Sequence, residues 1–295
     1  MQDTLTADTS RPASSAYLLV VPLLIVDSLH FVFARLLLPH ISPGVSAMYV
    51  LAIGTIEVGV FSLIRGGLHI RVLKRYLWFF LVIGFLVAAS TNINYEAVAF
   101  IDPGTAALLA ETYILFGVAL GLFWLGDKLT LPQIGGALVA LVGVFIITFQ
   151  PGEYMRIGSL MVLGSALMYA LHAAIAKRYG GGIEFLDFFF FRLLCTTGFL
   201  LLFALGRQAV VWPSATAWPL LILVGTVDVV VSRTLYYVAL RRLRMSIHSI
   251  VLTLSPVAAI CWSMLLFDTF PTPQQLLGGA AVILGVLLVS LGRNT

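Results

Sequence analysis

Long apolar runs separated by short polar segments make up almost the whole chain. A bilayer core about 30 Å thick needs roughly 20 apolar residues in helical form. Runs of this kind recur at residues 16–38, 43–64, 74–99, 104–124, 133–149, 156–177, 185–205, 215–239, 244–267 and 274–292. The pattern therefore predicts an all-α integral membrane protein with ten transmembrane helices joined by short loops.

The composition agrees with this assignment. Of the 295 residues, 60% are hydrophobic and only 10% are charged, whereas soluble domains carry about 25% charged residues. Residues 1–15 are polar and lack the basic start of a signal peptide, so they are predicted to form a disordered cytoplasmic tail. No cofactor or metal site is predicted, and no catalytic motif indicates an enzyme.

Lys and Arg are distributed unevenly between alternate loops. Twelve of the 17 basic residues fall on the side of the N-terminus, whereas Arg156 and Arg207 alone fall on the opposite side. Positively charged loops remain in the cytoplasm, so both termini are predicted to be cytoplasmic. The same bias accounts for the net charge of +4, so no nucleic-acid partner is predicted. The lipid bilayer is the predicted surroundings of the chain.

The sequence repeats itself weakly at a constant offset of 142 residues. "LHFVFAR" (29–35) aligns with "LHAAIAK" (171–177), which pairs His30 with His172. The same offset, without a gap, pairs Thr55 with Thr197, Tyr95 with Tyr237, Gln133 with Gln275, Gly136 with Gly278 and Gly143 with Gly285. Because each unit (16–149 and 150–295) would hold five helices, an odd number, the second must enter the membrane from the opposite side. Inverted repeats of this kind are typical of secondary transporters.

These features resemble the drug/metabolite transporter superfamily, EamA type, over residues 16–292. The resemblance is carried by first helices that end in a base, Arg192 early in a second helix, "SPVAA" (255–259), and the last helices beginning at Gln133 and Gln275. Within the superfamily the chain looks closest to the YddG-like exporters of amino acids, aromatic ones among them. The resemblance implies export across the bacterial inner membrane by alternating access through a cavity between the repeats. Multidrug or nucleotide-sugar carriers of the same superfamily are the alternative.

Polar side chains at membrane depth are the candidates for the substrate path, because they are costly in lipid and face the bundle interior or a cavity. The predicted substrate-binding residues are His30, Tyr49, Asn94, Tyr95, Glu111, Tyr169, His172, Arg192, Tyr237 and Ser255. The predicted coupling residues are Asp27, Glu57 and Glu111. The alternative role for the histidines and acids is a structural hydrogen bond. The alternative role for each tyrosine is packing between helices. The substrate is expected to be a small molecule, and the protein is expected to be a monomer, with a homodimer left open.

Two further patterns concern the helices themselves. Ser255 and Pro256 are expected to break the ninth helix, which frees backbone groups near its centre. Glycines at seven-residue spacing in the fifth and tenth helices indicate a close-packed seam, so these two helices are assigned to packing. Asp27 aligns with Tyr169 in the second repeat, which makes the two halves chemically different at this position.

Overall fold

The computed structural model describes residues 20–65, 67–125, 130–148, 157–236 and 254–291. All regular structure in these ranges is helical. In the first half the segments are α2 (Val20–Asp27), α3 (His30–Leu37), α4 (Pro43–Ile64), α5 (Ile70–Arg75), α6 (Leu77–Ala97), α7 (Pro103–Ala110), α8 (Tyr113–Leu120), the π-helix η1 (Gly121–Leu125) and α9 (Leu131–Thr148). In the second half they are α10 (Ile157–Tyr179), α11 (Phe185–Gly206), α12 (Ala217–Val224), the π-helix η2 (Gly225–Val231), α15 (Ser255–Phe267) and α16 (Pro273–Leu291).

Six described helical stretches are long and apolar enough to cross a membrane. They are Pro43–Ile64, Leu77–Ala97, Pro103–Trp124, Ile157–Tyr179, Phe185–Gly206 and Ala217–Tyr236. Helices also lie within the other four predicted ranges, but there they are shorter, interrupted or only partly inside the described residues. The helical, membrane-spanning character is thus confirmed, while the count of ten crossings stays a prediction.

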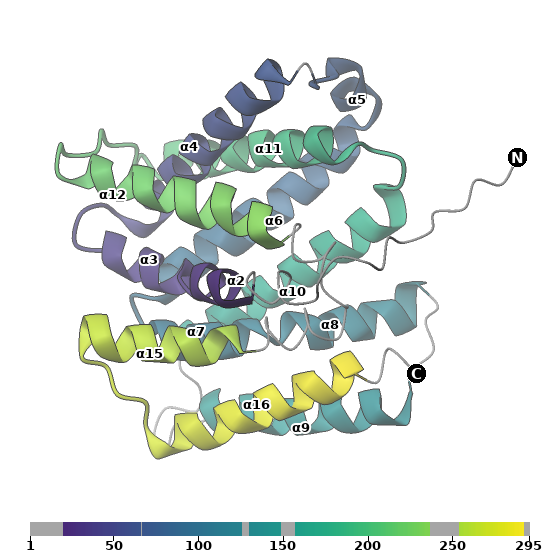
Figure 1. Cartoon of the computed structure of the whole chain (residues 1–295), viewed down its shortest axis with the longest axis vertical. Helices are drawn as coiled ribbons and strands as arrows, with labels where there is room; N and C mark the ends of the chain where they lie inside the picture. Colours follow the sequence, from purple (N-terminus) through teal and green to yellow (C-terminus); the bar gives the residue numbers. More distant parts are fainter. Residues whose placement is uncertain (1–19, 66, 126–129, 149–156, 237–253, 292–295) are drawn as a thin grey trace, which may run out of the picture.

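The helices run broadly side by side, and their connections lie at the two ends of the bundle (Figure 1). The left-hand end in Figure 1 is where α3, α6 and α11 end and where α4 and α12 begin. The α4–α5 and α10–α11 connections lie at the right-hand end. Basic side chains concentrate at that right-hand end, as in Arg71, Lys74, Arg75 and Arg178.

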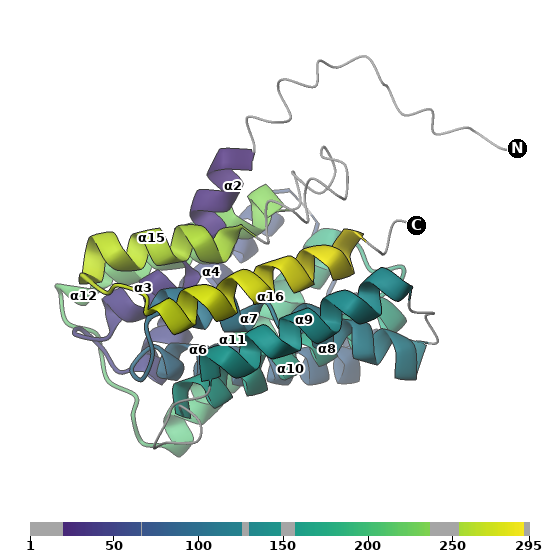
Figure 2. The ribbon, with the colours of Figure 1, turned by 90° about the horizontal axis from the view of Figure 1, so that it is seen from below.

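The glycine seam predicted from the seven-residue spacing is confirmed. Helices α9 and α16 lie against each other along one side of the bundle (Figure 2). A Cβ added to Gly136 would lie 2.6 Å from the carbonyl oxygen of Gly285, and one added to Gly143 would lie 2.6 Å from that of Gly278. Only glycine permits this backbone approach, which holds the two helices together by close van der Waals packing.

The seam contacts are reciprocal. Gly136 contacts Gly285, which is the repeat equivalent of Gly143. Gly143 contacts Gly278, which is the repeat equivalent of Gly136, so the contact is isologous. Thr55 Oγ1 lies 2.9 Å from Oγ1 of Thr197, its own equivalent at the offset of 142. The two halves therefore contact each other through corresponding surfaces.

The glutamines that carry the family resemblance cap these two helices. Thr272 and Gln275 form a reciprocal capping box at the start of α16: Thr272 N donates to Gln275 Oε1 (2.7 Å), and Gln275 N donates to Thr272 Oγ1 (3.2 Å). At the start of α9, Thr130 N donates to Gln133 Oε1 in the equivalent way (2.9 Å). Their role is to satisfy the N–H groups at the helix start.

Candidate functional site

Two helices are interrupted beside an acidic side chain. The first predicted helix ends as α2 at Asp27 and resumes as α3 at His30. The fourth ends as α7 at Ala110 and resumes as α8 at Tyr113, with Glu111 inside the interruption. Non-helical backbone is tolerated at membrane depth only where it is buried in protein or lines a water-filled cavity. Each interruption places a carboxylate, that of Asp27 or Glu111, at a short turn whose residues keep right-handed helical dihedral angles.

Each interruption also carries a hydroxyl side chain that competes for the helical carbonyls. Ser28 Oγ donates to Ile25 O (2.8 Å), and Thr112 Oγ1 donates to Leu109 O (2.7 Å). Hydrogen bonds of this kind back to the preceding turn bend helices. The hydrophobic pattern predicts neither break, although an acid followed by Ser or Thr inside an apolar run marks both.

A third irregularity supplies another acid. The π-helix η2 holds Asp228, whose side chain is buried. A π-helical turn inserts an extra residue and re-aims the side chains that follow, and such turns are frequent at functional sites. Asp228 Oδ2 lies 2.8 Å from His30 Nδ1, across 198 residues of sequence. The irregular turn thus faces the break between α2 and α3.

The side chains at these irregular segments meet those of α10, α11 and α15. We call the group the central polar cluster. It comprises Asp27, His30, Glu111, Tyr113, Tyr169, His172, Arg192, Asp228, Arg233 and Ser255. Three carboxylates and two guanidinium groups therefore share one region between the two halves.

Asp27 is the hub of the first-half side of the cluster. Its carboxylate interacts electrostatically with the Arg233 guanidinium, accepts a hydrogen bond from Ser255, and lies within electrostatic range of Asp228 and Glu111. Ser255 is the first residue of α15 and is followed by proline at the helix start. Asp27 is the last residue of α2 and is half-buried.

Tyr169 is the hub of the second-half side. It is hydrogen-bonded to Arg192, interacts electrostatically with Arg233, and packs edge to face on Tyr113 with ring centroids 5.8 Å apart. His172 is buried one turn further along α10, with its ring 5.2 Å from that of Tyr169. Arg192 of α11 therefore reaches across to Tyr169 of α10.

The two sides correspond residue by residue in position and differ in chemistry. At the offset of 142, Asp27 is equivalent to Tyr169, and Tyr113 is equivalent to Ser255. The contact between Asp27 and Ser255 is therefore the counterpart of the contact between Tyr169 and Tyr113. One side is ionic and the other aromatic, so a bound molecule would meet two different walls at equivalent places.

His30 and His172 differ in the same way. His30 contacts Asp228 and places its ring edge to face on the buried Tyr95, at 5.9 Å. His172 has no hydrogen-bond partner of ordinary geometry for either ring nitrogen among the residues that the structure describes. The identical residues of the repeat are thus placed in different surroundings by their neighbours.

Other predicted site residues lie elsewhere. Tyr49 donates from its hydroxyl to Val211 O (3.1 Å), in the connection between α11 and α12. Asn94 accepts a hydrogen bond from Ser165 between α6 and α10. Glu57 accepts one from Thr226 (2.7 Å). Tyr237 lies outside the described residues.

Asp228, Arg233 and Tyr113 enter the cluster although the sequence-based site omits them. All three are polar groups at membrane depth, but that property is shared by many residues here. The sharper sequence signals are the acid-hydroxyl pairs at the two breaks. For the π-helix and Arg233 no local signal in the sequence stands out.

A second polar contact joins the halves at the right-hand end. His69, between α4 and α5, donates its backbone N–H to Asp187 Oδ1 (2.9 Å), and its Nδ1 lies 3.0 Å from Asp187 Oδ2. Glu184 brings a third potential ligand atom within 4.8 Å of these two residues. His69 thus contacts both carboxylate oxygens of Asp187 and links the α4–α5 connection to α11.

Comparison with known proteins identifies the family. The model of the EamA-like transporter family matches residues 14–149 and, a second time, residues 156–291. The chain belongs to the EamA-like transporter family. The two matches follow the two halves that the 142-residue offset indicates.

Individual relatives are distant. The chain is 29% identical over 204 residues to a probable terminal-alkyne amino-acid exporter of Streptantibioticus cattleyicolor, a match that covers 66% of this chain and 67% of that protein. It is 26% identical over 201 residues to the uncharacterized transporter YdfC of Bacillus subtilis, covering 66% and 64%. A solved crystal structure matches with a TM-score of 0.66 at 20% identity, covering 95% of this chain and 98% of the other. The last match shows the shared fold.

Proposed function

We propose that the protein exports amino acids and similar small zwitterions across the bacterial inner membrane by alternating access. The observation that carries the proposal is the central polar cluster, in which carboxylates and guanidinium groups converge on interrupted helices between the two halves. A zwitterion needs partners of both signs, and Asp27 and Arg192 lie on different sides of the cluster. The amino-acid exporter among the distant relatives supports the same substrate class.

The reciprocal contacts support inverted repeats as the basis of the transport cycle. Secondary transporters of this kind bind substrate between the repeats, where discontinuous helices present free backbone groups. The breaks at Ser28 and Thr112 and the π-helix η2 are the discontinuities here. The concentration of basic residues at the right-hand end of Figure 1 supports placing that end, with both termini, in the cytoplasm. We propose a monomer as the transporting unit.

Flux in liposomes tests the substrate class. With the purified chain reconstituted into liposomes loaded with single radiolabelled amino acids, we expect at least one, including aromatic ones, to leave at least about ten times faster than from protein-free liposomes. Loss of flux when the carboxylate is methylated or the amine acetylated is expected, because each change removes one of the two charges. Flux of quaternary-ammonium drugs or nucleotide sugars without any amino-acid flux would contradict the proposal and favour the alternative carrier classes.

Proton coupling is expected to depend on the acids of the cluster. Glu111 lies within electrostatic range of Asp27, whereas Glu57 is hydrogen-bonded to Thr226 elsewhere. We therefore expect Glu111→Gln to abolish the response of flux to an imposed pH gradient and Glu57→Gln to retain most of it. Flux measured with and without the gradient decides this, and flux of the unmodified protein that ignores the gradient would exclude proton coupling.

A further inference from the structure

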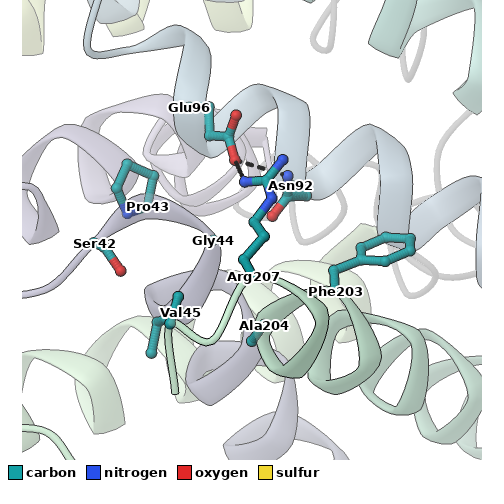
Figure 3. A pocket seen from close by; sticks show the side chains of 10 residues that line it. Ser42, Pro43, Gly44, Val45, Asn92, Glu96, Phe203, Ala204 and Arg207 are labelled. Carbon is teal, nitrogen blue, oxygen red and sulfur yellow. Dashed lines mark hydrogen bonds and ion pairs between the residues drawn. The ribbon is translucent and has the colours of Figure 1, made fainter. Parts of the chain in front are cut away.

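A small cavity lies among segments that meet at the left-hand end of the bundle in Figure 1, and Figure 3 shows it from close by. None of the residues that line it belongs to the central polar cluster. Its volume is about 200 Å³, well above the roughly 10–15 Å³ that one water molecule needs. The start of α4 and the end of α6 supply one wall, and the end of α11 supplies the other. The cavity therefore lies between the two halves of the protein.

The cavity presents one acid and one base side by side. Arg207, which follows the last residue of α11, donates from its guanidinium to Glu96 near the end of α6 (Figure 3). Asn92, one turn earlier on α6, donates from Nδ2 to the same Glu96 oxygen (3.0 Å) and holds the carboxylate toward the cavity. Phe203 gives the cavity an apolar side.

The ion pair is exposed enough to exchange partners. The Arg207 side chain is 59% exposed and that of Glu96 is 27% exposed. An exposed ion pair contributes only about 0–1 kcal/mol, so it opens at little cost when a competing pair of charges arrives. Because Glu96 and Arg207 belong to different halves, their contact is sensitive to how the two halves pack at this end.

A second cation lies near the same helix end. Arg35, at the end of α3, donates from its guanidinium to the carbonyl of Val98, which caps the end of α6. The α6 terminus is thus bracketed by Arg35 and Arg207, and one carboxylate, Glu96, balances one of them. Of the two arginines Arg207 lines the cavity, where its guanidinium can receive the carboxylate of an approaching molecule.

From this arrangement we propose that the cavity is a second, outer binding site for the transported amino acid. The Glu96–Arg207 pair opens there, Arg207 receives the carboxylate, Glu96 receives the ammonium group, and the substrate side chain lies against Phe203. The proposal rests on amino-acid transport as the function and adds a relay position on the path between the central polar cluster and the outside. Release of the substrate lets the ion pair close again across the two halves.

Binding stoichiometry tests the outer site. With the full-length protein in detergent and radiolabelled L-phenylalanine as the first probe, followed by any other amino acid that shows flux in liposomes, we expect two molecules per chain by equilibrium dialysis. Arg207→Gln and Glu96→Gln are each expected to leave one, and to weaken the lost site at least about ten-fold. Arg233→Gln is expected to remove the central site and to leave the outer one.

The possible failures are distinguishable. A protein that neither transports nor binds any amino acid would refute the proposed function itself. Binding of one molecule that Arg233→Gln abolishes, with Arg207→Gln and Glu96→Gln indistinguishable from the unmodified protein, would refute the outer site and leave the proposed function standing.

A glycine variant tests the shape of the cavity without changing its two charged side chains. A Cβ on Gly44 would lie 2.7 Å from Asn92 Oδ1, so Gly44→Ala pushes the Asn92 side chain into the cavity while both charges remain. We expect it to weaken outer binding about as much as Arg207→Gln does. Gly164→Ala is the matched control, because a Cβ there meets nothing within 4 Å among the described residues. Unaltered outer binding in Gly44→Ala would contradict the cavity as the site.

Discussion

Replacing Asp27 by Asn is expected to lower amino-acid flux at least about ten-fold. The Asp27 carboxylate faces Arg233 and accepts a hydrogen bond from Ser255, and the change removes its charge at almost constant shape. A buried polar group that loses its partner costs about 1–3 kcal/mol and a charged group costs more, and about 1.4 kcal/mol corresponds to ten-fold in affinity. The loss should be seen as a raised half-saturation concentration in the liposome assay, because an ammonium group loses its anionic partner.

The control for Asp27 is the same change at an exposed acid. Asp268 follows α15 with a left-handed backbone (φ 50°), a conformation that Asn also tolerates well. Asp268→Asn is therefore expected to leave flux unchanged. If Asp27→Asn leaves both the flux and its pH dependence unaltered as well, then Asp27 has a structural role and the central polar cluster is not the substrate site.

Replacing Gly136 by Ala is expected to destabilise the protein by about 1–3 kcal/mol, the usual cost of overpacking. The added Cβ would lie 2.6 Å from the backbone oxygen of Gly285, which no side-chain movement relieves. A melting temperature several degrees lower in detergent is the expected result. Gly285→Ala should have a similar effect, because the contacts are reciprocal and its Cβ would lie 2.4 Å from Ala140 N.

The neighbouring residue gives the control for the seam. A Cβ on Gly135 meets nothing within 4 Å among the described residues, so Gly135→Ala is expected to leave the melting temperature unchanged or to raise it slightly through better helix propensity. Equal melting temperatures for Gly135→Ala and Gly136→Ala would show that α9 and α16 do not pack through their glycines in solution.

Several features are accessible from the sequence because they depend on local pattern. The predicted helix at 43–64 and the observed Pro43–Ile64 coincide, since a proline at the helix start and an uninterrupted apolar run mark both ends. The seven-residue glycine spacing predicts a seam between the fifth and tenth helices, and the structure contains it. For the first and fourth helices the apolar run conceals a break, because hydropathy is insensitive to a hydroxyl group bonding back to the chain.

Which acids belong to the central polar cluster does not follow from the hydrophobic pattern of the sequence. Asp27, Glu57 and Glu111 are each a single acid in an apolar run, and all three are predicted coupling residues; in the sequence Asp27 and Glu111 differ from Glu57 in the Ser or Thr that follows them. In the structure Glu57 binds Thr226, whereas Asp27 and Glu111 share the cluster. Which acids meet depends on how α2, α4 and α7 cross, and hydrophobic periodicity carries no information about those crossings.

By itself, the sequence determined that this chain is a helical membrane protein in two related halves, because apolar runs and a constant repeat offset are properties of the chain alone. Only the tertiary structure decided which polar groups become partners. His30 and His172 are identical and equivalent in the repeat, yet one contacts Asp228 across 198 residues and the other packs against Tyr169. The reason is that a side chain's partner is set by the helices packed around it, and those differ between the two halves.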